Sequence, residues 1–272
     1  MGIIDSARAW LYEPRIRDVD VDDRILLELH ARVLMEKPLL RSAFETFYRD
    51  MATLCDRFLC APGIELELGT GVGFFRKVRP NLITSDVRPA ANVDVIVDAE
   101  EMALPSKSVR CIYAINVFHH LPHPDKFFEE LCRVLRPGGG CILIEPHIGL
   151  SSALLHRHMH VDEHFDPTAP TWHTANIRGP MSGANQALAD IVFTRDLDTF
   201  QKEYGDHLEI AYRGYCLNAL RYLFSGGLNF RQIFPSSCEP ILKGLELLGK
   251  PLARHWSLHQ ILVLRKRLVS PK

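Results

Sequence analysis

The sequence lacks the features that mark several broad protein classes. None of its apolar runs reaches the roughly 18–20 residues that a membrane-spanning helix needs, and its N-terminus lacks the charged-then-apolar order of a secretion signal. Its 32 basic residues are balanced by 33 acidic ones, without the basic excess of a typical nucleic-acid-binding protein. Its seven cysteines are odd in number and form no C-x-x-C pair, which argues against a disulfide scaffold. These absences predict a cytoplasmic protein.

The composition is that of an ordinary globular protein, and the sequence pattern divides the chain into a helical N-terminal segment and a main domain. The 272 residues are 47% hydrophobic and 24% charged. Residues 1–55 carry apolar residues at helical spacing and predict an N-terminal helical cap, with one helix over 22–37 ended by Pro38. Residues 56–272 form the predicted main domain. It is interrupted at about 147–205 by a stretch rich in proline, glycine and histidine that reads as an inserted lid.

Between residues 64 and 146, short apolar runs alternate with helical stretches. The apolar runs are 64–68, 82–85, 93–97, 111–115 and 141–144, and the helical stretches begin near residues 74 and 125. Such alternation predicts a parallel sheet with crossover helices. Two further segments, 208–215 and 259–265, have patterns typical of strands, and helical patterns lie between them at 217–224 and 241–248. The predicted class is α/β.

A glycine-rich loop follows the first predicted strand. It reads Glu67-Leu68-Gly69-Thr70-Gly71-Val72-Gly73-Phe74. Glycine permits tight backbone turns and lets a ligand touch the main chain, and a following helix would present free N–H groups. A dinucleotide fingerprint starting at Gly69 would need glycine where Phe74 stands. The carboxylate of Glu67 would lie poorly beside a pyrophosphate and well beside an ammonium group.

Two further acids follow the next two predicted strands. Asp86 ends the second strand, where a carboxylate can accept hydrogen bonds from a ribose diol. Asp98 follows the third, where it can accept from an adenine amino group. A simple helix cap is the alternative role for Asp86. A ligand with an ammonium group, a ribose, an adenine and no phosphate satisfies all three acids, and S-adenosylmethionine is such a ligand.

In this order the motifs resemble the class I S-adenosylmethionine-dependent methyltransferases, particularly the subgroup that includes ubiquinone/menaquinone-type methyltransferases. The matching blocks are 67–73, Asp86, 98–99, 116–122 and 135–140. The resemblance is firm over about 60–146, weak over 207–267, and absent over 1–55 and 147–205, the regions that usually shape the acceptor pocket in this family. It implies a Rossmann-like, doubly wound, mostly parallel seven-stranded sheet with N-terminal helices and an inserted lid region.

The resemblance also implies roles for individual residues. Glu67 would address the methionine amino group, Asp86 the ribose, and Asp98 the adenine amine. The implied cofactor-binding set is Glu67, Gly69, Thr70, Gly71, Gly73, Asp86, Val87, Asp98, Ala99 and Asn116. Helix packing alone is the alternative role for Gly73, and the glycines at 138–140 are predicted to form a turn without chemistry.

Histidines are concentrated in the middle of the chain, where nine of the 13 fall between residues 119 and 173. His119 and His120 follow the fourth predicted strand and are candidate general bases, although the family often carries such a pair without a proton-transfer role. Glu145 and His147 follow the fifth strand and are candidates for substrate contact. Within 156–164, three histidines at i, i+4 spacing raise the question of a metal, but no H-E-x-x-H motif occurs. We predict no metal site.

The predicted activity is methyl transfer from S-adenosylmethionine to a small or medium organic acceptor, such as a glycan, a lipid or a quinone-like molecule. The transfer needs mainly alignment, and a base only where the acceptor must lose a proton. A nucleic-acid acceptor is disfavoured because no Asn-Pro-Pro-Tyr type motif follows the fourth strand. Two alternatives stay open: a non-catalytic S-adenosylmethionine-binding protein, and a nicotinamide-dependent oxidoreductase, which fits Glu67 and Phe74 less well.

Charge is unevenly distributed despite the neutral total. From residue 207 onward the chain holds ten basic and three acidic residues. This C-terminal excess predicts attraction to an anionic substrate or peripheral contact with a membrane surface. A solvated basic face over an ordinary core is the alternative.

Overall fold

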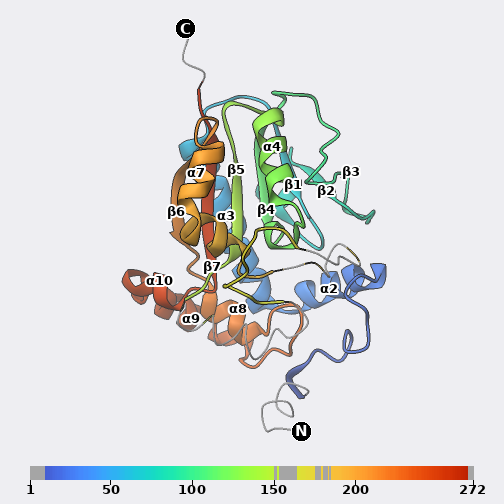
Figure 1. The fold of residues 1–272 in the computed structure, drawn as a ribbon. Coiled ribbons are helices and arrows are strands. Elements are labelled where there is room, and N and C mark those ends of the chain that lie inside the picture. Colours follow the sequence, from blue (N-terminus) through green and yellow to red (C-terminus); the bar gives the residue numbers. More distant parts are fainter. Residues whose placement is uncertain are drawn as a thin grey trace.

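A seven-stranded sheet forms the centre of the protein (Figure 1). The computed structural model describes residues 10–149, 152, 164–174, 179, 183 and 185–268. The sheet order is β3-β2-β1-β4-β5-β7-β6. The strands are β1 (Ile64–Leu68), β2 (Ile83–Asp86), β3 (Val95–Ile96), β4 (Val109–Ile115), β5 (Leu135–Pro146), β6 (Leu208–Tyr215) and β7 (His259–Lys266). Strands β1 to β5 pair in parallel and β7 is antiparallel to both its neighbours, which confirms the predicted fold class.

Helices cover both faces of this sheet, which explains why its central strands read as apolar runs. One face packs against α3 (Pro38–Phe58), whose side chains Phe47 and Met51 are buried. The other face packs against α4 (Pro124–Val134), η3 (Ile191–Arg195) and α7 (Leu197–Tyr204). Successive residues of β4 serve opposite faces, with Ile112 in one apolar cluster and Tyr113 in the other.

Two helices follow residue 23 in the described part of the N-terminal segment, and the fold class predicted such N-terminal helices. Helix α2 (Arg24–Glu36) begins after Asp23, whose side chain accepts a hydrogen bond from the Ile25 N–H. Lys37 separates it from α3, which starts with Pro38 at its first position. The predicted domain boundary at residue 55 falls inside α3, a helix that packs directly on the sheet.

Two local predictions were wrong. The helix expected after the glycine loop is only the short 3₁₀ turn η1 (Phe75–Lys77), with Pro80 soon after it. The glycines at 138–140 lie inside β5, where the pairing with β4 passes from Val109↔Leu135 to Cys111↔Gly140. The extra residues of β5 form a bulge in which Gly138 has a φ of 78°.

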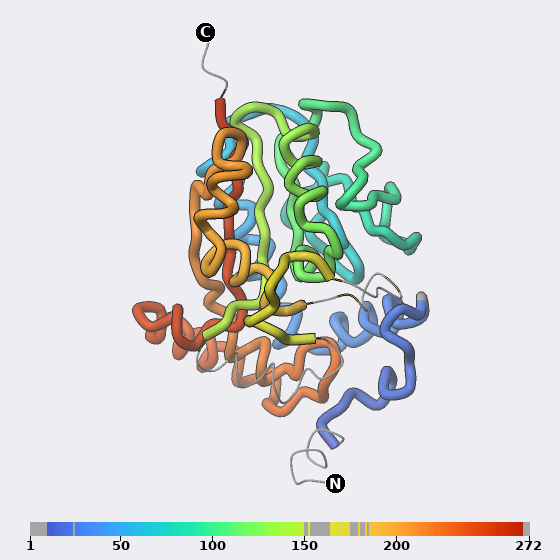
Figure 2. The backbone as a smooth tube through the Cα atoms, in the orientation of Figure 1, coloured from blue at the N-terminus to red at the C-terminus, as the bar shows by residue number. Residues whose placement is uncertain are grey.

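The last part of the predicted insertion is helical. It forms α6 (Leu188–Asp190), η3 and α7, and buries Phe193 and Phe200 in the core. After β6 the chain forms α8 (Ala219–Ser225), η4 (Ser236–Cys238), α9 (Glu239–Leu248), η5 (Lys250–Leu252) and α10 (Ala253–Trp256). Figures 1 and 2 show α2, α8 and α9 together at one end of the sheet. None of the helices within the described residues is both long enough and apolar enough to span a membrane.

Candidate functional site

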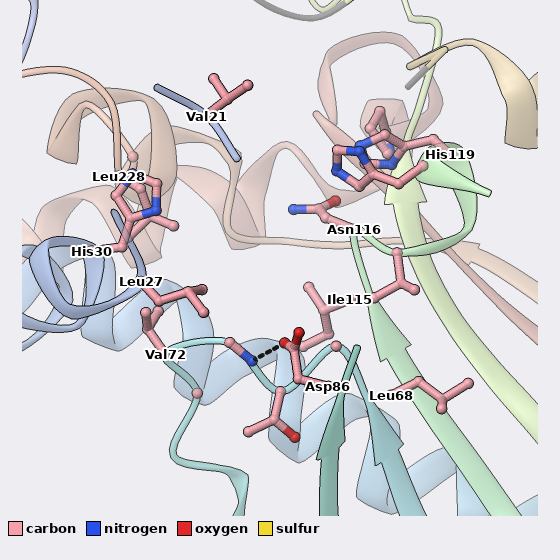
Figure 3. Close-up of a pocket in the computed structure, with 18 of the residues that line it drawn as sticks. Val21, Leu27, His30, Leu68, Val72, Asp86, Ile115, Asn116, His119 and Leu228 are labelled. Atoms are coloured by element: carbon pink, nitrogen blue, oxygen red, sulfur yellow. Dashed lines mark hydrogen bonds between the residues drawn. The ribbon is translucent and has the colours of Figure 1, made fainter. Parts of the chain in front are cut away.

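A cavity of about 680 Å³ lies at the carboxyl ends of the parallel strands (Figure 3). This is the edge at which open α/β sheets bind their ligands. All the residues predicted to bind the cofactor line this cavity, and so do both candidate bases: Glu67, Gly69, Thr70, Gly71, Gly73, Asp86, Val87, Asp98, Ala99, Asn116, His119 and His120. Glu145 and His147 are not among the lining residues. The structure therefore brings together the cofactor set and the histidine pair.

The glycine loop is tightly folded over the end of β1. Gly69 and Gly71 have φ values of 61° and 50°, in the left-handed region that favours glycine. A Cβ on Gly69 would lie 2.4 Å from Val117 Cγ2, and one on Gly73 would lie 2.5 Å from the hydroxyl of Tyr48. Packing requirements therefore fix glycine at positions 69 and 73, and these glycines also form part of the cavity wall.

Glu67 is a buried acid without a compensating cation at hydrogen-bond distance among the described residues. Its Oε2 accepts a hydrogen bond from Thr70 Oγ1 at 3.1 Å. Burial raises its pKa to about 8 because the charged form is poorly solvated. A ligand ammonium group would supply the missing positive charge, so the residue fits the methionine amino group of S-adenosylmethionine.

Asp86 ties the end of β2 to the glycine loop. Its two carboxylate oxygens accept hydrogen bonds from the Gly71 N–H at 3.1 Å, drawn as the dashed line in Figure 3, and from the Arg88 N–H at 3.0 Å. The helix-cap alternative is wrong, because residues 87–94 form no helix. Asp98 is exposed, and its Oδ1 accepts from the Glu100 N–H at 2.8 Å. Both carboxylates keep lone pairs for a ligand, since each oxygen can accept more than one hydrogen bond.

Asn116 turns the chain at the end of β4. Its φ is 55°, a left-handed conformation that asparagine tolerates better than most residues. Its N–H donates to the Ile144 carbonyl at 2.8 Å, which places the side chain at the cavity wall. Its Oδ1 is buried and has no hydrogen-bond partner among the described residues, so it is a ready acceptor for a ligand donor.

Directly after Asn116, the chain wraps around the carboxylate of Glu145. This carboxylate accepts hydrogen bonds from the backbone N–H groups of Val117 at 3.0 Å and Phe118 at 2.8 Å. Its Oε2 lies 2.6 Å from Nδ1 of His119. Glu145 is fully buried and does not line the cavity, so its predicted contact with substrate stays a prediction that this position does not support. Glu145 instead fixes the orientation of the His119 ring.

The two remaining predicted residues of this group differ in position. His120 lines the cavity, and its ring centroid lies 4.1 Å from that of His119. His147 is buried away from the cavity wall, with Nε2 2.9 Å from the Arg254 carbonyl oxygen and Nδ1 3.6 Å from Asp190 Oδ2. These contacts join the end of β5 to α10 and α6, and the predicted substrate contact of His147 stays a prediction that this position does not support.

The sequence did not single out Tyr48, which reaches the site from α3. Its hydroxyl oxygen accepts the Phe74 N–H at 3.2 Å, and its ring stacks on Phe75 at 4.6 Å between centroids. Burial, together with the nearby Glu67 carboxyl, raises the pKa of Tyr48 well above its usual value, so the phenol stays neutral. Tyr48 therefore holds the far end of the glycine loop.

The cavity wall opposite the sheet is mostly apolar and comes from distant parts of the chain. Figure 3 shows Leu27, His30 and Leu228 on this side, facing Asn116 and His119 across the cavity. The sequence signals for this wall were the apolar spacing of the N-terminal helix and the helical pattern over 217–224. Its lining residues include Leu11, Val21, Leu26, Leu27, His30, Phe44, Tyr222, Leu223, Leu228, Phe230, Ile233 and Leu258.

Potential metal ligands occur away from this cavity. The ligand atoms of His123, Asp125 and His173 lie within 4.8 Å of one another. His173 Nε2 and Asp125 Oδ1 are 2.9 Å apart and already satisfy each other as a hydrogen-bonded pair. None of the three residues lines the cavity. Of the histidine cluster at 156–164, only His164 lies within the described residues, where it pairs with Asn185.

Solved structures similar to this chain include proteins from bacteria and a nematode. The YcgJ protein of Bacillus subtilis is 14% identical over 82% of this chain and 99% of its own, with a TM-score of 0.46. A putative methyltransferase of Bacillus halodurans is 15% identical over 80% and 98%, with a TM-score of 0.42. A Haemonchus contortus phosphoethanolamine N-methyltransferase in complex with S-adenosylhomocysteine is 12% identical over 81% and 53%, with a TM-score of 0.43.

No curated protein matches the sequence. A family model described as a methyltransferase domain matches residues 66–143. The matched segment holds the glycine loop, Asp86, Asp98 and the histidine pair that face the cavity. The site of this protein is therefore built on a segment that matches the methyltransferase domain family, and the match supports S-adenosylmethionine as the cofactor.

Proposed function

We propose that this protein transfers a methyl group from S-adenosylmethionine to a small or medium organic acceptor that is largely apolar, such as a lipid or a quinone-like molecule. The proposal rests on one observation: the predicted cofactor residues, an apolar wall and His119, which faces that wall across the cavity, all line a single cavity. The family match over residues 66–143 supports methyl transfer as the reaction class.

The cofactor residues have complementary tasks in this proposal. Bound S-adenosylmethionine supplies a methyl group on a positively charged sulfur, which is an activated leaving group. Glu67 accepts hydrogen bonds from its ammonium group, Asp86 from the ribose hydroxyls and Asp98 from the adenine amine. The left-handed Gly69 and Gly71 let the ligand approach the backbone closely.

His119 is the proposed general base for an acceptor that must lose a proton. Glu145 accepts the Nδ1–H of His119, so Nε2 is the ring nitrogen that can take a proton. The nearby carboxylate also stabilises the imidazolium that forms. This arrangement suits an acceptor that is a hydroxyl or an amine. The acceptor oxygen or nitrogen forms a bond to the methyl carbon while the bond between that carbon and sulfur breaks, and the acceptor proton moves to His119.

The apolar wall supplies the acceptor preference. Leucine and aromatic side chains from α2, α3, α8 and the segment after α8 line the side of the cavity away from the sheet. These side chains favour an apolar body and leave little polar surface to bind a sugar. They also reduce the access of water to the transferred methyl group.

Calorimetric titration with S-adenosylmethionine, S-adenosylhomocysteine and NAD tests the cofactor. We expect the two adenosyl ligands to bind and NAD not to bind. Asp86→Ala should weaken binding by about 1–3 kcal/mol, while Asp206→Ala, at an exposed position outside the cavity, should leave it unchanged. Binding of NAD alone would favour the oxidoreductase. Binding of both adenosyl ligands, with no turnover of any apolar hydroxyl or amine compound, would favour the non-catalytic alternative.

A further inference from the structure

Helix α9 exposes its apolar face, unlike an ordinary surface helix. Such a helix normally turns its apolar stripe towards the core. In α9 the buried residues are Leu242 and the acid Glu246, whereas Ile241, Leu245 and Leu248 are 65%, 51% and 80% exposed. These three exposed residues have i, i+4, i+7 spacing and form one stripe. Leu247, at 66%, and Leu252 in η5, at 62%, add to the same exposed apolar surface.

Polar contacts on the inner side hold α9 in this orientation. Glu246 accepts hydrogen bonds from Arg221 of α8, from its Nε at 2.7 Å and from its backbone N–H at 2.9 Å. Both side chains of this pair are buried. Arg221 also donates from Nη1 to the Ser42 carbonyl of α3 at 2.9 Å. A buried ion pair anchored to two other helices fixes which face of α9 points outward, so the exposed stripe is part of the fold.

The charges around the stripe are positive. Lys243, Lys250 and Arg254 are exposed within or just after α9. Of the two acids of α9, Glu246 is buried against Arg221, and Glu239 is paired with Lys243 at 2.6 Å, which leaves Lys250 and Arg254 as the net positive charge beside the stripe. Apolar side chains flanked by basic ones are typical of helices that lie in the interface of an anionic bilayer. A symmetric contact between two copies of this surface would instead bring like charges together.

Exposed apolar residues also connect this region with the cavity wall. Leu223 of α8 and Ile233, which precedes α9, both line the cavity and are 37% and 53% exposed. Phe234 follows, 39% exposed, with its ring stacked on Phe224 at 4.2 Å between centroids. Exposed apolar residues therefore occur both at the cavity wall and, further along the chain, in α9.

We propose that α9 and η5 dock this protein onto the surface of an anionic lipid bilayer. The stripe of Ile241, Leu245 and Leu248, with Leu247 and Leu252, enters the boundary between headgroups and acyl chains, and the flanking basic residues contact lipid phosphates. Docking in this way places the cavity wall next to a phase in which an apolar acceptor is dissolved. The docking itself goes beyond the proposed function and does not require methyl transfer.

Co-sedimentation of the full chain with vesicles tests this proposal. The vesicles are phosphatidylcholine mixed with phosphatidylglycerol, and phosphatidylcholine alone as the neutral comparison. We expect binding to the mixed vesicles that weakens with added salt. The double variant Leu245→Glu/Leu248→Glu should bind at least about tenfold more weakly, because it removes apolar area and adds negative charge at the interface.

Leu268→Glu is the matched control. Leu268 is 68% exposed, like the α9 leucines, but it follows β7 at the amino-terminal end of the parallel strands. It should bind vesicles as the unmodified protein does. All three proteins should keep the same melting temperature and the same affinity for S-adenosylhomocysteine, because the substituted side chains are exposed and none lines the cavity. This second readout separates failure of docking from failure of the proposed function.

Two outcomes would overturn the proposal. One is equal vesicle binding by the unmodified protein and the α9 double variant, which would place any lipid contact elsewhere. The other is no vesicle binding by the unmodified protein. If sedimentation velocity then shows a dimer that Leu245→Glu/Leu248→Glu dissociates, the stripe is an interface between two copies of the chain.

Discussion

The buried carboxyl of Glu67 should make cofactor binding depend on pH. Burial raises its pKa to about 8, so in the ligand-free protein most Glu67 side chains are protonated at pH 7. An ammonium group binds the carboxylate, not the neutral acid. Binding must therefore release the proton from Glu67, and affinity must rise as the pH rises towards the folded-state pKa.

The size of this effect follows from the pKa. Below about pH 7, one unit under this pKa, the ionised fraction of Glu67 changes nearly tenfold for each pH unit. The affinity for S-adenosylhomocysteine should therefore rise about tenfold between pH 6 and pH 7, or about 1.4 kcal/mol. At pH 7 about 0.9 proton should be released for each ligand bound.

Calorimetry in two buffers with different ionisation enthalpies measures both quantities, because released protons add the buffer's heat to the observed enthalpy. Above pH 8 the Glu67→Gln variant should bind S-adenosylhomocysteine more weakly than the unmodified protein does. Its affinity should not depend on pH, and its binding should release no proton. Glu65→Gln is the control: Glu65 lies on the same strand but contacts Arg110 and Tyr113 outside the cavity. It should lower stability and keep the pH dependence. An unmodified protein whose affinity is constant between pH 6 and pH 7, together with an unchanged affinity of Glu67→Gln above pH 8, would refute the pairing of Glu67 with the ammonium group.

Three further substitutions test other parts of the structure. Tyr48→Phe removes the acceptor of the Phe74 N–H, so calorimetry should show a loss of about 1 kcal/mol in affinity for S-adenosylhomocysteine; an unchanged affinity would mean that the hydroxyl does not support the loop. Glu145→Gln should lower kcat with an identified acceptor by about 100-fold and shift the acidic limb of its pH profile to lower pH, because His119 loses a carboxylate; an unchanged profile would exclude His119 as the base. Glu246→Gln leaves Arg221 buried without its partner, so the free energy of unfolding in urea should fall by about 3–5 kcal/mol; a loss below 1 kcal/mol would show that the pair does not anchor α9.

The parallel sheet could be predicted because its central strands, buried on both faces, read as short apolar runs. Glu67, Asp86 and Asp98 could be predicted as site residues because each is at or just after the carboxyl end of a strand, and these ends meet at one edge. The prediction of a helix after the glycine loop was wrong for a different reason. Its residues Phe74 and Phe75 look helical in pattern, but they pack around Tyr48 of α3, a contact that spacing alone does not reveal.

The apolar wall could not be predicted because its residues are distant in sequence. Leu27 of α2 and Leu228 after α8 face the same cavity, yet about 200 residues separate them and no local periodicity relates the two segments. The role of Glu145 was hidden for a related reason. Its position at the carboxyl end of β5 indicated the site, but its burial depends on the turn at residues 116–119, whose N–H groups converge on its carboxylate.

Helix α9 shows why an apolar pattern does not by itself identify a core face. The sequence predicted a helix at 241–248, and the usual inference places its leucines inside. The structure places Glu246 inside instead, because Arg221 on α8 supplies a buried partner for its carboxylate. Removing water from both charges is unfavourable unless they pair well. If α9 were turned with its apolar stripe inward, the pair would be exposed to water and this desolvation free energy would not arise. The chain nevertheless keeps the pair buried and the leucines exposed, and for this reason we expect the exposed face to bind a ligand. A lipid surface can contact both the apolar and the basic side chains of this face.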